Sequence, residues 1–360
     1  MWITSSLSKA HTPTDVALGN FDGVHLGHQT VIRPILPPQT TWRSVEDSLT
    51  TEPVASLQGY SDRSSSLLAA SDLQASQVAP LPPNKAPIPT VVTFYPHPRE
   101  FFLDEVRPWL TPLEEKAAFM RQLGVGQLVL LPFNQELANL SPETFIERVL
   151  LERLQAKHIS VGADFRFGHG RTGTVELLEK LATRQGVTVT VVDLAENEGD
   201  RISSSRIRQA LCTGDVPQAQ QLLGRPYRLT GRVVQGQQLG RQLGFPTANL
   251  NVSADKYLPR TGVYSVRVYG VPGTIAHQGL PGVMNLGVRP TVDGKRQTIE
   301  VHLLNWDGNL YGSTLTVELK GFLRPEQRFE SLENLKAQIQ ADCAAAQTAL
   351  EVGNYSGSTA

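Results

Sequence analysis

Short apolar runs alternate with helical patterns between Asp15 and about Leu223, and this alternation constrains the fold more than any other feature of the chain. Five runs are typical of strands: DVALGNF, PTVVTFYP, QLVLLPF, HISVGADF and VTVTVVDL. Between them, apolar residues recur at helical spacing in TPLEEKAAFMRQLG, SPETFIERVLLERLQA and TVELLEKLATRQG. Strands that alternate with helices predict a parallel sheet covered on both faces, with ligands bound beyond the carboxyl ends of its strands.

The pattern changes between Tyr227 and Gly321, where short β-rich segments are joined by Gly, Pro and Asp turns. These segments are RLTGRVV, GVYSVRVYG, LPGVMNLGV, QTIEVHLL and STLTVELKGFL. Short strands at this spacing predict a closed barrel or a sandwich. A final helix, SLENLKAQIQADCAAAQTAL, is predicted after Phe329. The chain is therefore expected to join an α/β domain to a mainly-β barrel domain with a C-terminal helix.

The chain of 360 residues is long for one hydrophobic core and favours two domains. We expect the first domain over 1–224, the second over 225–350 and a loose tail over 351–360. Residues 37–89 are rich in Ser, Pro, Gln, Thr and Ala, which predicts a low-complexity insertion with little packed core. Loop-closure entropy grows only logarithmically with length, so a well-packed domain tolerates such an insertion.

Composition excludes several classes of protein. The net charge of −1 and the pI near 6.7 leave no basic excess for general nucleic-acid binding. The apolar runs are far shorter than a membrane span, and the N-terminus lacks the apolar stretch of a secretory signal. Cys212 and Cys343 are too few for a disulfide framework. We therefore expect a cytoplasmic protein with neither nucleic acid nor membrane as a partner; composition leaves the oligomeric state open.

The segment GNFDGVHLGH connects the first predicted strand to the helical pattern HQTVIRPIL. Such a glycine-rich turn exposes backbone N–H groups, and the helix N-terminus favours anions. His25 and His28 stand at i and i+3, so both imidazoles can reach one anion and stabilise a phosphoryl transition state. No lysine is nearby in sequence and no GxxxxGK[ST] occurs, which favours attack at the α-phosphate of ATP with pyrophosphate leaving. The alternatives are a solvated or structural histidine pair and a zinc pair.

Two later segments also suit a nucleotide. ISSSRIRQAL places three hydroxyls before two arginines at a helix start, which predicts an N-cap and an anion cradle. GADFRFGHG ends a strand with a glycine–aromatic loop suited to the close approach of a flat ring. The alternatives are a capped helix with surface arginines and a structural turn with two packed phenylalanines.

GNFDGVHLGH resembles the HxGH motif of the nucleotidyltransferase superfamily, in the form found in bacterial bifunctional riboflavin kinase/FAD synthetases (FMN adenylyltransferases). VVTFYPHPREFF, GADFRFGHGRTG and ISSSRIRQAL are similar to later motifs of that family, in the same order. The chain departs from the family at Ser205, where Thr is usual, and at the 37–89 insertion. The resemblance implies a Rossmann-like first domain in which His28, His25 and Arg208 are catalytic. It also implies these nucleotide-binding residues: Gly19, Phe21, Asp22, Gly23, Asp164, Arg166, Ser203 and Ser205.

In the second half, GRVVQGQQLGRQLGFPTANL resembles the ATP and magnesium segment of riboflavin kinases. Thr247 supplies a hydroxyl and Asn249 a carbonyl, both hard oxygen ligands that suit Mg²⁺. The structural alternative for this segment is a proline turn with an Asn cap.

The segment TIEVHLLNWDG alternates with period 2, which puts Glu300 and His302 on one face of a strand. A carboxylate facing into a small barrel is costly unless it has a partner or a task. The resemblance places the catalytic base at Glu300, which would accept the proton of the ribityl hydroxyl, whereas the alternative is a solvated strand face. The resemblance also suggests flavin contacts by Asn285, Arg289 and Arg324.

Together these features predict two-step synthesis of a flavin cofactor. The second domain would phosphorylate riboflavin with ATP to give FMN. The first would transfer AMP from a second ATP to FMN, giving FAD and pyrophosphate, with Mg²⁺ at both steps. The alternatives are a single-activity enzyme whose other domain is a binding module, a non-catalytic flavin sensor, and an RNA-linked protein with the HxGH geometry of class I aminoacyl-tRNA synthetases. Motifs in both halves oppose the first, and the near-neutral charge opposes the last.

Overall fold

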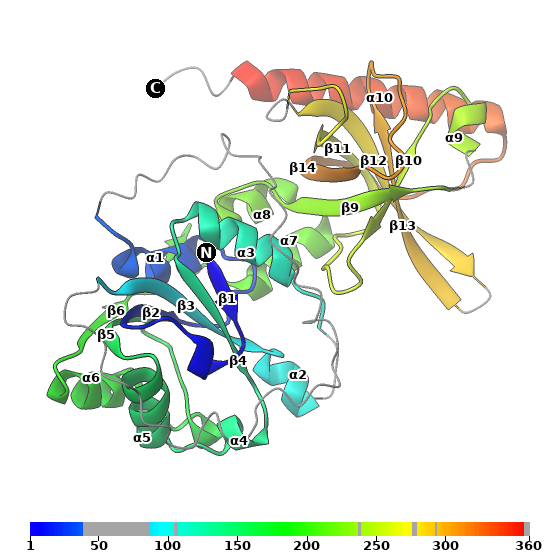
Figure 1. Ribbon diagram of the computed structural model, residues 1–360. Helices are drawn as coiled ribbons and strands as arrows, with labels where there is room; N and C mark the ends of the chain where they lie inside the picture. The colour runs from blue at the N-terminus through cyan, green and yellow to red at the C-terminus, as the bar shows by residue number, and fades with distance from the viewer. Residues whose placement is uncertain (39–85, 104–106, 237–238, 276–278, 292–293, 356–360) are drawn as a thin grey trace. The chain divides into compact units, whose positions relative to one another are not determined.

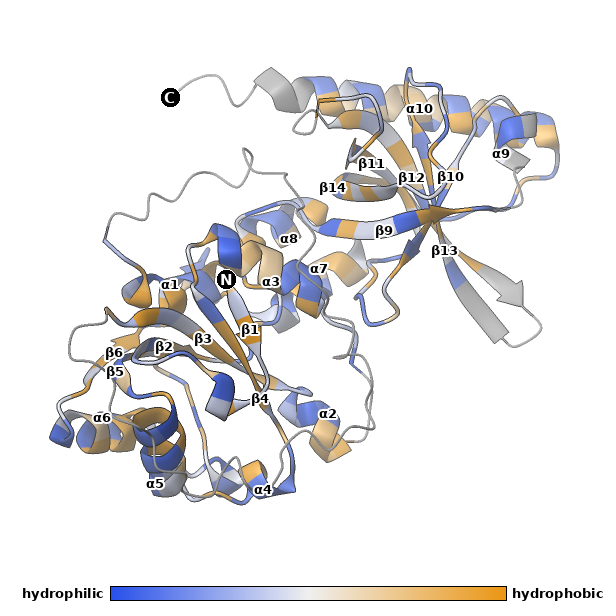
Figure 2. Ribbon diagram, in the orientation of Figure 1, coloured by the Kyte–Doolittle hydropathy of each residue, from blue (hydrophilic) through white to orange (hydrophobic). Residues whose placement is uncertain are grey.

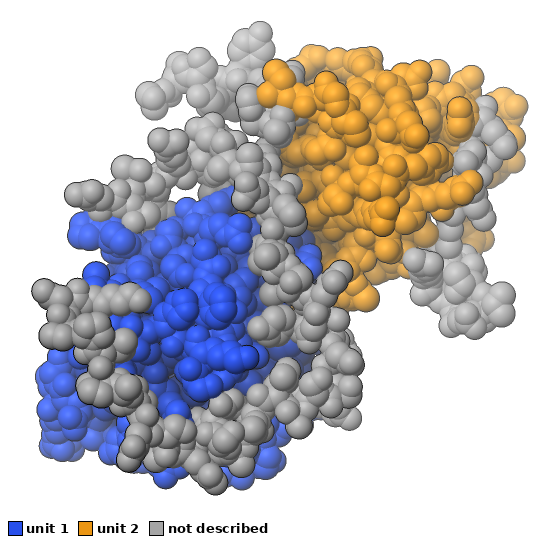
Figure 3. All heavy atoms as spheres, in the orientation of Figure 1, with its two compact units in different colours: residues 1–43, 52–107, 111–202 blue, residues 44–51, 108–110, 203–360 orange. Residues whose placement is uncertain are grey.

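The computed structural model describes residues 1–38, 86–103, 107–236, 239–275, 279–291 and 294–355. The chain divides into two compact units, which Figure 3 colours separately. Unit 1 comprises 1–43, 52–107 and 111–202, and unit 2 comprises 44–51, 108–110 and 203–360. Almost all of the predicted 37–89 insertion lies outside the described residues. The division at 202 lies before the expected domain boundary at 224. The two helices between these positions, Ser204–Thr213 and Val216–Leu223, fall in unit 2, and the second of them packs against the barrel. The boundary at 224 stays a prediction.

Unit 1 is built on a six-stranded sheet in the order β1-β4-β3-β2-β5-β6, and its neighbouring strands pair in parallel, as the sequence predicts. The chain adds strands on one side of β2 and then, from β5, on the other. This reversal is the point at which open α/β sheets bind their ligands. Figure 2 shows apolar residues along much of β3, which lies inside the sheet. The strands are β1 (Trp2–Thr4), β2 (Thr14–Leu18), β3 (Ile88–Tyr95), β4 (Gln127–Pro132), β5 (Ala156–Gly162) and β6 (Thr188–Val192).

Helices cover both faces of this sheet, with α1 and α3 on one side and α5 and α6 on the other (Figure 1). Right-handed crossovers place them so, because the chain travels in opposite directions on the two sides of β2. The α-helices are α1 (Leu26–Ile32), α2 (Pro98–Leu103), α3 (Leu113–Gln122), α4 (Gln135–Ala138), α5 (Pro142–Thr144) and α6 (Val175–Arg184). The remaining elements are the π-helix η5 (Phe145–Arg153), the short 3-10 helices η1 (Leu7–Lys9), η2 (Arg33–Ile35) and η6 (His169–Arg171), and the hairpin β7 (Glu196–Asn197) and β8 (Asp200–Arg201).

Unit 2 contains a closed antiparallel barrel in the order β10-β13-β12-β11-β14-β9, which decides between the two predicted β architectures. The strands are β9 (Arg228–Val234), β10 (Ala248–Val252), β11 (Gly262–Tyr269), β12 (Leu280–Thr291), β13 (Gly294–Leu303) and β14 (Thr314–Arg324). Two helices precede the barrel, α7 (Ser204–Thr213) and α8 (Val216–Leu223), and the short α9 (Leu239–Gln242) lies between β9 and β10.

The final helix, α10 (Leu332–Tyr355), packs on the outside of the barrel through Ala346 and Cys343, which join a cluster with Val263 and Val283. Polar and apolar bands alternate along it in Figure 2, as expected for a helix that lies on a surface. The helix continues to Tyr355, whereas the sequence predicts a loose tail from residue 351.

Candidate active sites

The turn between β2 and α1 has an unusual backbone conformation that side chains from elsewhere in unit 1 hold in place. Phe21 and Val24 have positive φ values of 49° and 39°, which are strained for residues other than glycine. Gly23, at φ 88°, uses the freedom that only glycine has, and its N–H donates to Thr111 Oγ1 at 2.7 Å. The turn therefore has a defined shape at the switch point of the sheet.

The turn presents His25 and His28 as a stacked pair, with ring centroids 3.6 Å apart and an interplanar angle of 17°. His25 is buried at 5 % exposure and caps α1, because its Nδ1 accepts the backbone N–H of His28 at 3.3 Å. The edge of the fully buried Phe21 ring lies against His28, which is itself half-buried. The spacing thus brings both imidazoles to one place, with His28 the member that a ligand can reach. Among the described residues, no group of three His, Cys, Asp or Glu side chains could hold a metal, so the zinc alternative has no support there.

Asp164 and Arg166 follow β5, the neighbour of β2, so they lie at the same edge of the sheet as the histidine turn. The Asp164 carboxylate accepts a hydrogen bond from Arg201 on β8, and the two side chains are 47 % and 51 % exposed. Such an exposed ion pair contributes little stability and can open for a ligand. Arg166 is exposed and donates to the carbonyl of Phe165 at 3.0 Å.

Ser203, Ser205 and Arg208 belong to unit 2. Ser203 is the N-cap of α7, as the hydroxyl run predicts, and its Oγ accepts the N–H of Arg206 at 3.3 Å. The Arg208 guanidinium donates to the carbonyl of Pro108 at 2.9 Å and lies over the ring of Tyr257 at 5.3 Å. Arg208 is thus oriented by contacts within its own unit, and its contact with a triphosphate stays a prediction.

Three predicted site residues form a row across the barrel. Glu300 on β13 is the register partner of Asn249 on β10 and of Asn285 on β12. Side chains directly opposite each other on neighbouring strands have Cβ atoms about 5 Å apart, so these three polar groups are close together. The sequence alternation is confirmed, because Ile299 and Val301 are buried while Glu300 is only half-buried. Glu300 therefore lies on the less buried face of β13, opposite the apolar side chains of Ile299 and Val301.

The loop that precedes β10 packs tightly against this row. A Cβ on Gly236 would lie 2.2 Å from Asn249 Nδ2, and one on Gly240 would lie 2.4 Å from the Phe245 carbonyl. His302 Nδ1 donates to the carbonyl of Pro246 at 2.8 Å, which fixes the loop beside Glu300. Thr247 and Asn249 lie two residues apart on the segment that these contacts hold.

The remaining predicted flavin residues, Arg324 and Arg289, lie on β14 and β12. Arg324 forms a two-pronged ion pair with Asp342 on α10, at 2.9 and 2.8 Å, and lies over the Phe329 ring. This pair joins β14 to α10, so Arg324 has a structural role. Arg289 on β12 is in register with Arg296 on β13. Flavin contacts by Asn285, Arg289 and Arg324 stay predictions.

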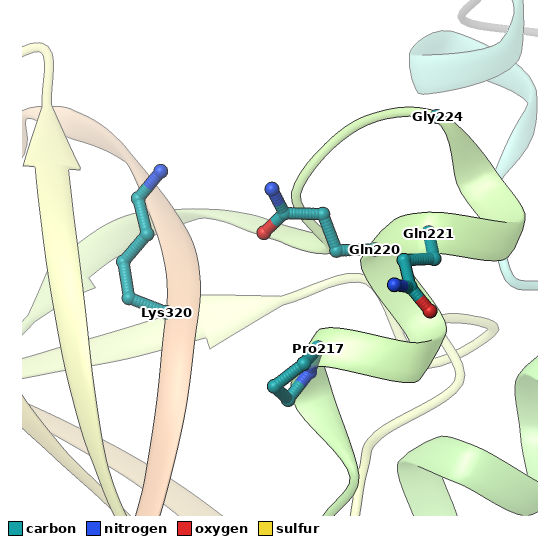
Figure 4. Close-up of a pocket in the computed structure, with 5 residues that line it drawn as sticks. All are labelled: Pro217, Gln220, Gln221, Gly224 and Lys320. Carbon is teal, nitrogen blue, oxygen red and sulfur yellow. The ribbon is translucent and has the colours of Figure 1, made fainter. Parts of the chain in front are cut away.

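A hollow of about 400 Å³ lies elsewhere in unit 2 (Figure 4). It is open to solvent, and Lys320 extends into it from β14 while the other lining residues come from α8 and its end. None of the predicted site residues lines it, and the Lys320 ammonium already pairs with Glu318 at 3.1 Å. We therefore assign no chemistry to this hollow.

The sequence did not identify Lys116. Among the described residues, this lysine contacts the histidine turn. It is buried at 3 % exposure on α3, and its Nζ donates to the carbonyl of Asn20 at 3.2 Å. The signal was a lysine inside the apolar stripe of TPLEEKAAFMRQLG, where Ala117, Phe119 and Met120 are also buried. The sequence shows no lysine near the histidines because the fold, and not the chain order, brings this one to the turn.

The two folds and their sites define a class of protein: an HxGH-type nucleotidyltransferase unit followed by a barrel of the riboflavin kinase type. The FAD synthetase family model matches residues 7–41 and 78–206, leaving 42–77 unmatched, and the riboflavin kinase family model matches 223–350. The chain belongs to the family of bifunctional riboflavin kinase/FMN adenylyltransferases.

Relatives match this chain over most of its length. A bifunctional riboflavin kinase/FMN adenylyltransferase of Pseudomonas fluorescens is 40 % identical over 343 residues, which is 95 % of this chain and 94 % of its own. The protein of that name from Escherichia coli K12 is 37 % identical, over 91 % of this chain and 90 % of its own. A crystal structure from Streptococcus pneumoniae, described as a macrolide-efflux protein, is 28 % identical with a TM-score of 0.73 and covers 96 % of this chain and 98 % of that one. Within the described ranges, no helix is both long and apolar enough to cross a membrane.

Proposed function

We infer that this chain makes FAD from riboflavin in two ATP-dependent steps. Riboflavin is phosphorylated to FMN in the barrel, and FMN then receives an adenylyl group in unit 1 with release of pyrophosphate. The observation that carries this inference is the presence of both family matches in one chain, together with relatives that are bifunctional over nearly its full length. A single-activity enzyme would not need both sets of site residues.

For adenylyl transfer, an oxygen of the FMN phosphate bonds to the α-phosphorus of ATP. The bond from that phosphorus to the bridging oxygen breaks, and its electron pair leaves with pyrophosphate. Negative charge builds up on the phosphoryl oxygens, and the half-buried His28 can donate to it. The burial of His25 and its bond to the His28 backbone support a role in orienting the pair.

For the kinase step, the carboxylate of Glu300 accepts the proton of the terminal hydroxyl of riboflavin as that oxygen attacks the γ-phosphorus of ATP. ADP leaves with the electron pair of the broken bond. The register partners of Glu300, Asn249 and Asn285, bring amide groups to the same row, where they can orient the carboxylate and the substrates. This arrangement supports Glu300 as the base of the kinase step.

Kinases and adenylyltransferases that use ATP typically need a divalent metal, and we propose Mg²⁺. The donors fit, because Thr247 and Asn249 offer a hydroxyl and an amide oxygen, and Asn249 packs against Gly236 so closely that its position is well defined. Mg²⁺ takes few protein oxygens and keeps water and substrate phosphates as its other ligands. When bound, it would neutralise phosphate charge.

One chromatographic assay tests the function. With riboflavin, ATP and Mg²⁺, FMN and ADP should appear first, followed by FAD and pyrophosphate. An enzyme with one activity would stop at FMN or would need added FMN, and a flavin sensor would bind flavin without consuming ATP. A cytoplasmic location and the absence of a nucleic-acid partner stay predictions.

Replacing residues 39–85 with a short Gly/Ser linker should leave both activities within a few-fold of the parent protein. The composition of this segment offers little apolar surface to bury, and the FAD synthetase family model leaves 42–77 unmatched. Both activities are measured on the purified deletion variant. Loss of FAD formation alone in a folded variant would show that the segment shapes the first site.

Gly236→Ala should lower riboflavin phosphorylation by roughly 10- to 100-fold, because a misplaced catalytic or metal-binding group is costly. Its new Cβ would lie 2.2 Å from Asn249 Nδ2, so the amide must move out of the row beside Glu300. Conversion of added FMN to FAD by the same preparation is the control and should not change. A kinase rate equal to that of the parent would mean that the position of Asn249 does not matter.

A further inference from the structure

Lys116 is a buried charge that the proposed chemistry does not use. It lies on α3 with 3 % of its surface exposed, among Ala117, Phe119 and Met120, which are also buried. Lysine is almost never fully buried unless its charge is paired, and methionine would fill the same space without a desolvation cost. The position therefore calls for a reason beyond packing.

The contacts of Lys116 lead to the histidine turn. Its Nζ donates to the carbonyl of Asn20 at 3.2 Å, and Thr93 Oγ1 on β3 donates to the same oxygen at 3.0 Å. Asn20 directly precedes Phe21, the first of the turn residues with positive φ. A strained backbone of this kind persists only where its surroundings hold it. Lys116 is one of the groups that hold it.

Two carboxylates from outside α3 lie close enough to the ammonium to favour its charged form. Asp22 lies on the turn itself, is 5 % exposed and stands three residues before His25. Glu100 lies on α2, and its two oxygens also accept the backbone N–H groups of His97 and Arg107 at 3.3 and 3.2 Å. Burial lowers the pKa of Lys116 to about 8, although both carboxylates favour the charged form. The side chain therefore carries its charge below about pH 8 and loses it above that pH.

We propose that Lys116 is a positioning residue for adenylyl transfer: its ammonium holds the Asn20 carbonyl and balances Asp22, which keeps the turn that presents His25 and His28 in its working shape. The proposal rests on the function proposed above for that turn. Lys116 acts through the backbone and not on the substrate, because it is buried. Removing its charge takes away a cation that faces a buried carboxylate and loosens a strained turn.

The test compares Lys116→Met with the parent protein for conversion of FMN to FAD, from neutral pH to well above the Lys116 pKa of about 8. At neutral pH, kcat should fall by roughly 10- to 100-fold while KM for ATP and for FMN changes little, because the histidines are misplaced and the substrates still bind. In the parent, kcat should fall as the pH rises through about 8, and in Lys116→Met this fall should be absent.

Thr93→Val is the matched control, because it removes the neutral donor to the same carbonyl and leaves the charge. It should lower kcat but keep the alkaline fall. Riboflavin phosphorylation by each preparation reports whether the variants are folded. A parent profile without any alkaline fall, up to the pH at which the protein unfolds, would overturn the proposal even if Lys116→Met did not fold. A Lys116→Met variant with the parent's kcat, or with its alkaline fall, would overturn it too. His28→Ala decides what a contradicting result for Lys116 means. If His28→Ala also kept adenylyl transfer, the function proposed for the turn would be wrong. If His28→Ala were inactive, that function would stand and only the role proposed for Lys116 would be wrong.

Discussion

His28→Ala should stop FAD formation while FMN accumulates from riboflavin. The half-buried imidazole of His28 is the group of the stacked pair that we expect to donate to the charge developing on the α-phosphate. Removing one such donor typically costs roughly 100- to 1000-fold in rate. The fold should survive, because His25 caps α1 through the backbone N–H of residue 28, which alanine keeps. Chromatography of flavins, with FMN as the added substrate, measures the loss.

His11→Ala is the matched control for this variant, because His11 is an exposed histidine of unit 1 whose ring stacks on Trp2. It should form FAD at the parent's rate. Adenylyl transfer near the parent's rate in His28→Ala would show that the pair is structural, which was the alternative that the sequence left open.

The histidine pair could be predicted from the sequence because the features that bring the two rings together are local. The apolar run before Gly19 specifies the strand, and the glycines allow the turn. The i, i+3 spacing brings the rings of His25 and His28 together, which the 3.6 Å stacking confirms. The parallel sheet around it follows equally from the alternation of strands and helices.

Lys116 could not be predicted, because its partner Asn20 is 96 residues away along the chain. Only the packing of α3 against the turn brings them together. What the sequence does contain is a lysine at an apolar helical position, and that local inconsistency marks a residue with a specific task.

The barrel shows a second limit on what could be predicted from the sequence. Period-2 alternation correctly groups Glu300 with His302 and separates them from Ile299 and Val301, but it does not say which face points inward. In the structure, the buried face of β13 is the apolar one, which carries Ile299 and Val301. The row formed by Asn249, Glu300 and Asn285 depends on the register of three strands, and register is decided by long-range pairing that no local pattern contains.

Glu300→Gln should abolish riboflavin phosphorylation while leaving FAD formation from added FMN intact. Glutamine keeps the shape of the side chain and can still form hydrogen bonds, but it cannot accept the hydroxyl proton. General base catalysis typically contributes roughly 100- to 10,000-fold. Asp307→Asn is the matched control, because it removes an exposed carboxylate just beyond β13 and should phosphorylate riboflavin at the parent's rate.

Assaying Glu300→Gln and His28→Ala, each with riboflavin and with FMN, separates the two sites. Glu300 lies in the barrel of unit 2, and His28 lies at the sheet of unit 1. Changes at separate sites without shared partners act nearly independently, so each variant should lose one reaction and keep the other. Glu300→Gln should then make FAD only when FMN is supplied, and His28→Ala should convert riboflavin only as far as FMN. Loss of both reactions in either folded variant would mean that the two steps share a site or are strongly coupled, and the assignment of one reaction to each unit would be wrong.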